Sequence, residues 1–194
     1  GGELGKKGYY TAFFHGADNG SMGFEAFART AGYTHYFGRT EYNEANPDNK
    51  DFDGHWGIWD EKFFQFFGNT LSGFQQPFAA ALFSLSSHHP FAVPAEYEGV
   101  FPKGNKPIRQ CIGYTDNALK LFFEKVSKEP WYKNTLFVFT ADHTNSPERP
   151  EYETESGLFS VPVVFYQPGS DLKGFRKDVI AQQIDIMPTV LGYL

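Results

Sequence analysis

Short, continuous apolar runs separated by segments of helical periodicity most constrain the fold of this chain. The runs predict strands at Tyr9–Phe14, Phe78–Leu85, 135–140 and 158–166, with Pro162 indicating an edge or a bulge in the last. Helical spacing marks the segment before Gly32, residues 60–71 and residues 106–128, and a turn and a helix end the chain. Because strands alternate with helices, we predict an α/β fold with a mostly parallel sheet.

The composition limits the classes of function. Hydrophobic residues make up 41% and charged residues 21% of the 194 residues, which is typical of a globular protein. The net charge of −6 argues against nucleic-acid binding, and no basic cluster indicates a phospholipid surface. No run approaches the roughly 18 apolar residues of a membrane span, and no signal peptide opens the chain.

Polar side chains follow three of the predicted strands. His15 ends the first, His88 and His89 follow the second, and Asp142 and His143 follow the strand "TLFVFT". The carboxyl ends of parallel strands share one edge of a sheet, where ligands bind, so we expect these groups to converge. A long polar loop, "EYNEANPDNKDFDGHWG", is predicted before the helix at residue 60.

A carboxylate beside an imidazole is a suitable ligand pair for a divalent cation. Such a cation neutralises charge on a phosphoryl or sulfuryl oxygen, and a further histidine can donate a hydrogen bond to that oxygen. Structural alternatives stay open. His15 can be a capping residue, Asp142–His143 can form an Asx-type turn, and only one of His88 and His89 is expected to face the site.

Five segments together resemble the sulfatase branch of the alkaline-phosphatase-like superfamily, and most closely its lipoteichoic acid synthase and phosphoglycerol transferase group. These segments follow in order along nearly the whole chain: "GYYTAFFHG", "HWGIWDEKFF", "SLSSHHPF", "TLFVFTADHT" and "QQIDIMPTVLGYL". The Asp-His strand end together with the Asp-Ile-x-Pro-Thr segment is the most specific part of the resemblance.

The resemblance implies a three-layer α/β/α sandwich and a divalent metal site. Asp142 and His143 match two metal ligands, and His88 matches a catalytic histidine that contacts the substrate phosphate. Trp56 matches a tryptophan of the glycerol-phosphate pocket, and His15 is a further candidate for substrate binding. We expect Mn²⁺, with Mg²⁺, Ca²⁺ or Zn²⁺ as alternatives. No arginine follows Trp56 as it does in the synthases, although Arg39 lies elsewhere in the chain.

The resemblance also implies that residues 1–194 are an incomplete catalytic domain, truncated at both ends. The family's nucleophile precedes the His-Gly strand, so we expect none in this chain, and Cys111 lacks the Cys-x-Pro-x-Arg pattern of sulfatases. Alone, the chain is expected to be inactive and to bind metal weakly.

The parent protein is expected to be a phosphoglycerol transferase or phosphodiesterase that acts through a covalent Thr intermediate on a phosphate ester, such as lipid- or glycan-linked glycerol phosphate. The alternatives are a sulfatase acting on glycans and a non-catalytic binding domain. By resemblance, the parent lies on the extracytoplasmic face of the membrane or in the periplasm, with any membrane segment outside this chain.

Overall fold

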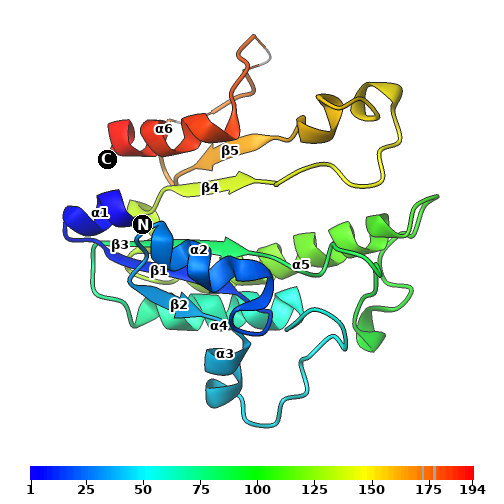
Figure 1. The fold of residues 1–194 in the computed structure, drawn as a ribbon, viewed down its shortest axis with the longest axis horizontal. Coiled ribbons are helices and arrows are strands. Elements are labelled where there is room, and N and C mark those ends of the chain that lie inside the picture. Colours follow the sequence, from blue (N-terminus) through cyan, green and yellow to red (C-terminus); the bar gives the residue numbers. More distant parts are fainter. Residues whose placement is uncertain (172, 177) are drawn as a thin grey trace. The chain divides into compact units, whose positions relative to one another are not determined.

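The computed structural model describes residues 1–171, 173–176 and 178–194. One residue of the turn predicted before the last helix, Lys177, therefore lies outside the described residues. The chain divides into two compact units, Gly1–Lys128 and Glu129–Leu194, and Figure 1 labels their helices and strands.

The first unit is built on a three-stranded parallel sheet. Its strands are β1 (Tyr10–His15), β2 (His35–Phe37) and β3 (Phe78–Phe83), in the order β2-β1-β3. Ala12 pairs with His35 on one side and with Ala80 on the other. The helices of this unit are α1 (Gly2–Lys6), α2 (Phe24–Thr30), α3 (Arg39–Ala45), α4 (Asp60–Ser72) and α5 (Ile108–Val126).

The central strand β1 is buried on both faces, because its alternate side chains enter two aromatic clusters. Phe14 packs against Phe37 and Phe67, with ring centroids 4.6 and 4.7 Å apart, and so faces α4. Phe13 points the other way and packs against Phe24 and Phe27 of α2, with ring centroids 6.3 and 6.4 Å apart. The sheet of this unit thus has α2 on one face and α4 on the other, which confirms the predicted α/β layering.

Helices α4 and α5 pack closely side by side (Figure 1). The rings of Phe67 and Phe122 are nearly parallel, with centroids 5.6 Å apart. A Cβ atom at Gly68 would lie 3.1 Å from Cγ1 of Val126, so glycine is what permits this approach.

A buried carboxylate fixes the start of α4. The Asp60 side chain accepts hydrogen bonds from the Leu85 N–H, at 2.8 Å, and from the Thr115 hydroxyl, at 2.9 Å. The Asp60 N–H donates in turn to the Ser86 hydroxyl, at 3.0 Å. One side chain therefore ties α4 to the segment that leaves β3 and to α5. Burial raises the pKa of Asp60, and the Leu85 and Thr115 hydrogen bonds oppose that rise.

The second unit contains an antiparallel pair, β4 (Phe137–Thr140) and β5 (Val163–Tyr166), with Phe137 opposite Tyr166. Helix α6 (Ile186–Tyr193) ends the chain, after a 3₁₀ turn at Gln183–Asp185. Pro162 immediately precedes β5, where its missing N–H costs no ladder hydrogen bond.

Three elements of the first unit, α3, β2 and β3, differ from the sequence prediction. The predicted long loop is partly helical, because α3 includes Glu41–Ala45, and the short strand β2 was not predicted. The Gly38 N–H donates to Glu41 Oε2, at 2.6 Å, and this hydrogen bond caps the start of α3. The polar composition of the segment had predicted a loop at Glu41. Strand β3 ends at Phe83 rather than at Leu85, because Leu85 turns to donate its N–H to Asp60.

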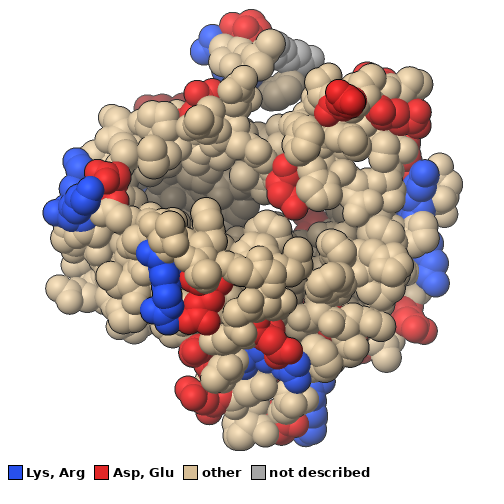
Figure 2. Space-filling view, viewed as in Figure 1, with Lys and Arg blue, Asp and Glu red and all other residues tan. Residues whose placement is uncertain are grey.

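Charged side chains are mixed on the surface. On the face shown in Figure 2, lysine and arginine lie among aspartate and glutamate. Within the described part of the chain, none of the helices has both the length and the hydropathy that crossing a bilayer requires.

Replacing Asp60 separates its hydrogen bonding from its charge. Asp60→Ala leaves the Leu85 N–H buried without its acceptor, and we expect the free energy of unfolding to fall by about 2–3 kcal/mol. Asp60→Asn keeps an acceptor oxygen but cannot ionise. Urea denaturation of the two variants and the unmodified chain between pH 4 and pH 8 measures both effects.

The sign of the pH effect follows from the raised pKa. Above the unfolded-state pKa of about 3.9, the unfolded chain releases the Asp60 proton more readily, so this group lowers stability as the pH rises through its folded pKa. Asp60→Asn should therefore gain stability relative to the unmodified chain as the pH rises. A difference that does not change with pH would contradict this account.

Candidate functional site

The loop that carries Trp56 is organised by one carboxylate oxygen. Asp53 Oδ1 accepts hydrogen bonds from the N–H groups of His55, Trp56 and Gly57, at 2.8, 2.8 and 3.0 Å. The three donors fix the backbone from which the indole projects. Sequence analysis did not select Asp53, although an Asp two residues before a turn is a recognised signal for such a cap.

The glycine after Trp56 is required by its surroundings. Gly57 forms an isolated antiparallel bridge with Ala17, and a Cβ atom there would lie 2.3 Å from the Gly16 carbonyl oxygen. No side chain fits in that space. The Trp-Gly pair is therefore fixed, through the Gly57 backbone, to the segment that follows β1.

Trp56 and His88 come together in the first unit. Their ring centroids are 4.7 Å apart with a 73° interplanar angle, and the Trp56 indole N–H donates to the His89 carbonyl oxygen at 2.6 Å. Both rings line a small cleft, together with residues that include Asp53, Trp59 and Ser86. Of the two adjacent histidines, His88 is the one that packs on Trp56, whereas the His89 ring lies edge-on to Phe91.

The hydrogen bonding of His88 sets its tautomer. His88 Nδ1 lies 3.0 Å from the His89 carbonyl oxygen, which can only accept, so Nδ1 carries the proton. Nε2 is left available, and the side chain is exposed to solvent. The neutral ring accepts a hydrogen bond at Nε2, and the protonated ring donates one there.

His15 lies in the core rather than in an open cleft. It is 2% exposed, its Nδ1 lies 3.2 Å from the Phe83 carbonyl oxygen, and its ring packs on Phe24. Burial lowers the pKa of His15 and so favours the neutral ring. This geometry favours the structural alternative, and substrate binding by His15 stays a prediction.

Asp142 and His143 come together in the second unit, directly after β4. Asp142 Oδ1 accepts a hydrogen bond from the His143 N–H at 2.9 Å, so the Asx-type arrangement weighed from the sequence is present. His143 Nδ1 lies 2.8 Å from the Thr144 carbonyl oxygen and therefore carries a proton. His143 Nε2 lies 3.3 Å from Asp142 Oδ2. The two atoms with free lone pairs, one on each side chain, therefore face one another.

This donor pair suits a cation. A neutral His143 with its proton on Nδ1 presents the Nε2 lone pair toward a carboxylate oxygen, and either a second proton or a metal ion relieves that opposition. Both side chains are about half exposed, at 54% and 48%, and so are accessible. Across the described residues, no three or more His, Cys, Asp or Glu side chains are grouped to hold a metal. Metal binding by Asp142 and His143 stays a prediction.

The segment "QQIDIMPT" braces the strand end that carries Asp142. The Gln183 amide donates to the carbonyl oxygens of Ala141 and Asp142, at 2.5 and 3.1 Å. Asp185 caps the turn by accepting the Gln182 N–H at 2.8 Å, and its carbonyl accepts the Thr189 hydroxyl at 2.6 Å. Gln183 was not selected from the sequence, because contacts between residues 40 positions apart leave no local pattern.

Arg39 already has partners. Its guanidinium forms an ion pair with Asp18 at 3.0 Å and lies 3.8 Å above the Phe52 ring. Cys111 is buried, and burial raises the pKa of its thiol to about 11, which is typical of an inert core cysteine.

Comparisons with known proteins agree on one family. The model of the sulfatase family matches residues 4–194. The lipoteichoic acid synthase-like protein YvgJ of Bacillus subtilis is 24% identical over 96% of this chain and 33% of its own length. Phosphoglycerol transferase I of Escherichia coli is 26% identical over 72% of the chain and 19% of its own length. The chain thus spans a third or less of each of these relatives.

Solved structures share the fold. The lipoteichoic acid synthase LtaP from Listeria monocytogenes superposes with a TM-score of 0.78 at 24% identity, over 97% of this chain and 50% of that one. The Streptococcus pyogenes phosphoglycerol transferase GacH, solved with sn-glycerol-1-phosphate, superposes with a TM-score of 0.53 at 15% identity, over 82% and 43%. Because the family model matches residues 4–194, nearly the whole length, the chain belongs to the sulfatase family.

Proposed function

We propose that these residues form part of the active site of a metal-dependent phosphoglycerol transferase or phosphodiesterase. The observation that carries the proposal is the Asp142–His143 pair, with its Nε2 and Oδ2 donor atoms 3.3 Å apart at a strand end. The names of the relatives add support, since they are lipoteichoic acid synthase-like proteins and phosphoglycerol transferases.

In this proposal Asp142 and His143 hold a divalent cation, with Mn²⁺ as the expected ion. The bound ion would supply charge neutralisation at a phosphoryl oxygen and lower the pKa of a hydroxyl nucleophile. The protein's own contribution is orientation: the Thr144 carbonyl keeps the His143 proton on Nδ1, and Gln183 holds the backbone of Asp142.

His88 and Trp56 serve the substrate in this proposal. Protonated His88 donates from Nε2 to a non-bridging phosphate oxygen, because its Nδ1 is already engaged by the His89 carbonyl. The Trp56 ring offers an apolar face to the glycerol moiety, as in the glycerol-phosphate pocket that the family resemblance implies. Asp53 is a positioning residue, since it acts through the backbone of Trp56.

The nucleophile is proposed to be a Thr outside these 194 residues, in keeping with the greater length of the relatives. In line with the resemblance, its hydroxyl oxygen would attack phosphorus and form a covalent phosphoester while the alcohol leaves. The substrate would be a lipid- or glycan-linked glycerol phosphate, and the whole protein would act on the extracytoplasmic side of a membrane.

The first test measures the metal site on this chain. Mn²⁺ titration followed by electron paramagnetic resonance should show weak binding that Asp142→Asn and His143→Gln each reduce at least about tenfold, because each removes one of two ligands. Asp48→Asn, which changes an exposed carboxylate that forms an ion pair with Lys50, is the control. Binding that survives both ligand substitutions would rule out this site.

The second test measures activity in the whole protein that carries these residues. A phosphodiester with a glycerol-phosphate head group should be cleaved in the presence of Mn²⁺, and His88→Gln should lower kcat about 10²- to 10³-fold. A matched sulfate ester should not be cleaved. Preference for the sulfate ester would establish the sulfatase alternative, and cleavage of neither would favour a binding domain.

The third test addresses the Trp56 loop. Asp53→Ala removes the acceptor of three N–H groups, so hydrogen exchange at His55–Gly57 should accelerate at least about tenfold, whereas Asp53→Asn, which retains an oxygen, should stay close to the unmodified chain. Asp48→Ala is the control for loss of a loop carboxylate. Unchanged exchange in Asp53→Ala would show that the loop is held by other contacts.

A further inference from the structure

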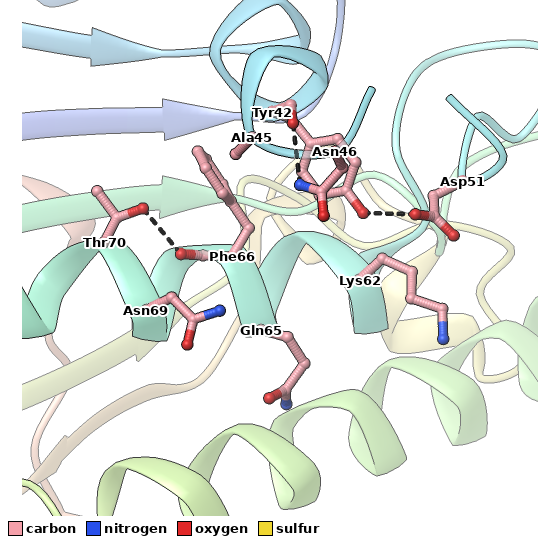
Figure 3. Close-up of a pocket in the computed structure, with 9 residues that line it drawn as sticks. All are labelled: Tyr42, Ala45, Asn46, Asp51, Lys62, Gln65, Phe66, Asn69 and Thr70. Carbon is pink, nitrogen blue, oxygen red and sulfur yellow. Dashed lines mark hydrogen bonds between the residues drawn. The ribbon is translucent and has the colours of Figure 1, made fainter. Parts of the chain in front are cut away.

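A second hollow in the first unit is separate from the Trp56–His88 cleft. It lies between α3 and α4 and has a volume of about 560 Å³. Figure 3 shows its nine lining residues, which come from α3, from the segment that follows it, and from one face of α4. None of them lines the cleft at Trp56. The volume is in the range of small-molecule sites.

The polar face of α4 is directed into this hollow. Lys62, Gln65 and Asn69 recur at intervals of three and four residues, so they lie along one side of the helix. The opposite side is committed to the core, where Phe63 and Leu71 are buried. The helical spacing that directs Phe63 and Leu71 into the core therefore also places Gln65 and Asn69 on the opposite side of α4.

Hydrogen-bonding capacity in the hollow is largely unused. The structure shows no hydrogen bond to the side-chain amides of Gln65 and Asn69 among the described residues, and Figure 3 shows both with no bond drawn to another lining residue. Asp51 receives the Tyr42 hydroxyl on Oδ2, at 2.6 Å, which leaves Oδ1 available. The Asn46 amide donates to the Tyr42 carbonyl, at 2.9 Å, which leaves its own oxygen available.

The charges do not favour an ionic ligand. The Lys62 ammonium is already paired with Glu61 Oε1 at 2.9 Å, and Asp51 places a carboxylate in the wall. A phosphate or sulfate would lack a free cation here and would meet the Asp51 carboxylate. A purely apolar ligand is also disfavoured, because the Tyr42 side chain is 3% exposed and such a ligand would leave the carboxamides of Gln65 and Asn69 without partners.

A ligand that matches this wall is uncharged and carries many hydroxyl groups. Each carboxamide can donate to one hydroxyl and accept from its neighbour, and a carboxylate oxygen accepts from another. The partly buried Phe66 ring supplies an apolar patch for the C–H face of a sugar ring. We propose that the hollow between α3 and α4 binds one or two neutral hexose units of a glycan, at a site distinct from the proposed phosphate site.

Sugar binding is tested directly on the ¹⁵N-labelled chain by amide chemical shifts, with glucose, maltose, cellobiose and N-acetylglucosamine each added to about 50 mM. At least one sugar should shift the signals of the residues that line the hollow, with a dissociation constant in about the millimolar range. Inorganic phosphate at the same concentration should not shift them. No shift with any of the four sugars, or a shift with phosphate instead, would overturn the proposal.

Matched variants locate the site. The double variant Gln65→Leu/Asn69→Leu should weaken binding at least about tenfold, with the dispersion of the remaining amide signals confirming that the chain is folded. Gln75→Leu, which changes an exposed amide outside the hollow, and Trp56→Ala should both retain the affinity. Binding that persists in the double variant, or that is lost in Trp56→Ala, contradicts the assignment. Neither outcome depends on the proposed catalytic activity.

Discussion

The hydrogen bonds of the buried Asp60 carboxylate set the arrangement on which the first unit depends. They link the start of α4 to the segment leaving β3 and to α5, and so fix the rotation and the axial position of α4. Trp59 and the Trp56 loop precede Asp60, and the amides of Gln65 and Asn69 follow it by one and two to three turns. Burying a carboxylate raises its pKa, but the two hydrogen bonds that it accepts, from the Leu85 N–H and the Thr115 hydroxyl, offset part of that cost and specify a single register.

Much of the fold follows from local pattern. The continuous apolar run of β1 and the helical spacing of α4 and α5 each predict the observed element, because burial on two faces or on one face imposes its own period. Strand β2 has only three residues, too few to establish a period, and α3 begins with a glutamate cap that lies inside an otherwise polar segment. Strand β2 is held by its pairing with β1, and Glu41 of α3 also accepts from the Asn19 amide, at 3.1 Å. A single sequence does not display these long-range contacts.

The candidate site divides in the same way. Asp142, His143, Trp56 and His88 are chemically conspicuous at strand ends or in motifs, and the structure pairs Asp142 with His143 and Trp56 with His88. The residues that orient them were not predictable in the same way. Gln183 reaches back across 41 positions to the Asp142 carbonyl, and the three donors to Asp53 are backbone groups common to every sequence. The sequence predicts which side chains can take part in the chemistry. The hydrogen bonds that orient these side chains are found only in the three-dimensional structure.

The close approach of Gly57 to Gly16 also bears on how proteins of this kind can diversify. The bridges Ala17–Gly57 and Phe52–Ile58 close the base of the segment between α3 and α4 with backbone contacts. Residues 46–51, beyond this closure, are joined to the core mainly at Tyr42 and Trp59. Their length and sequence can therefore change without displacing Trp56. Changes in this segment, which contributes Asn46 and Asp51 to the hollow, would therefore alter the wall beside α4 and leave the backbone bridge at Gly57 in place.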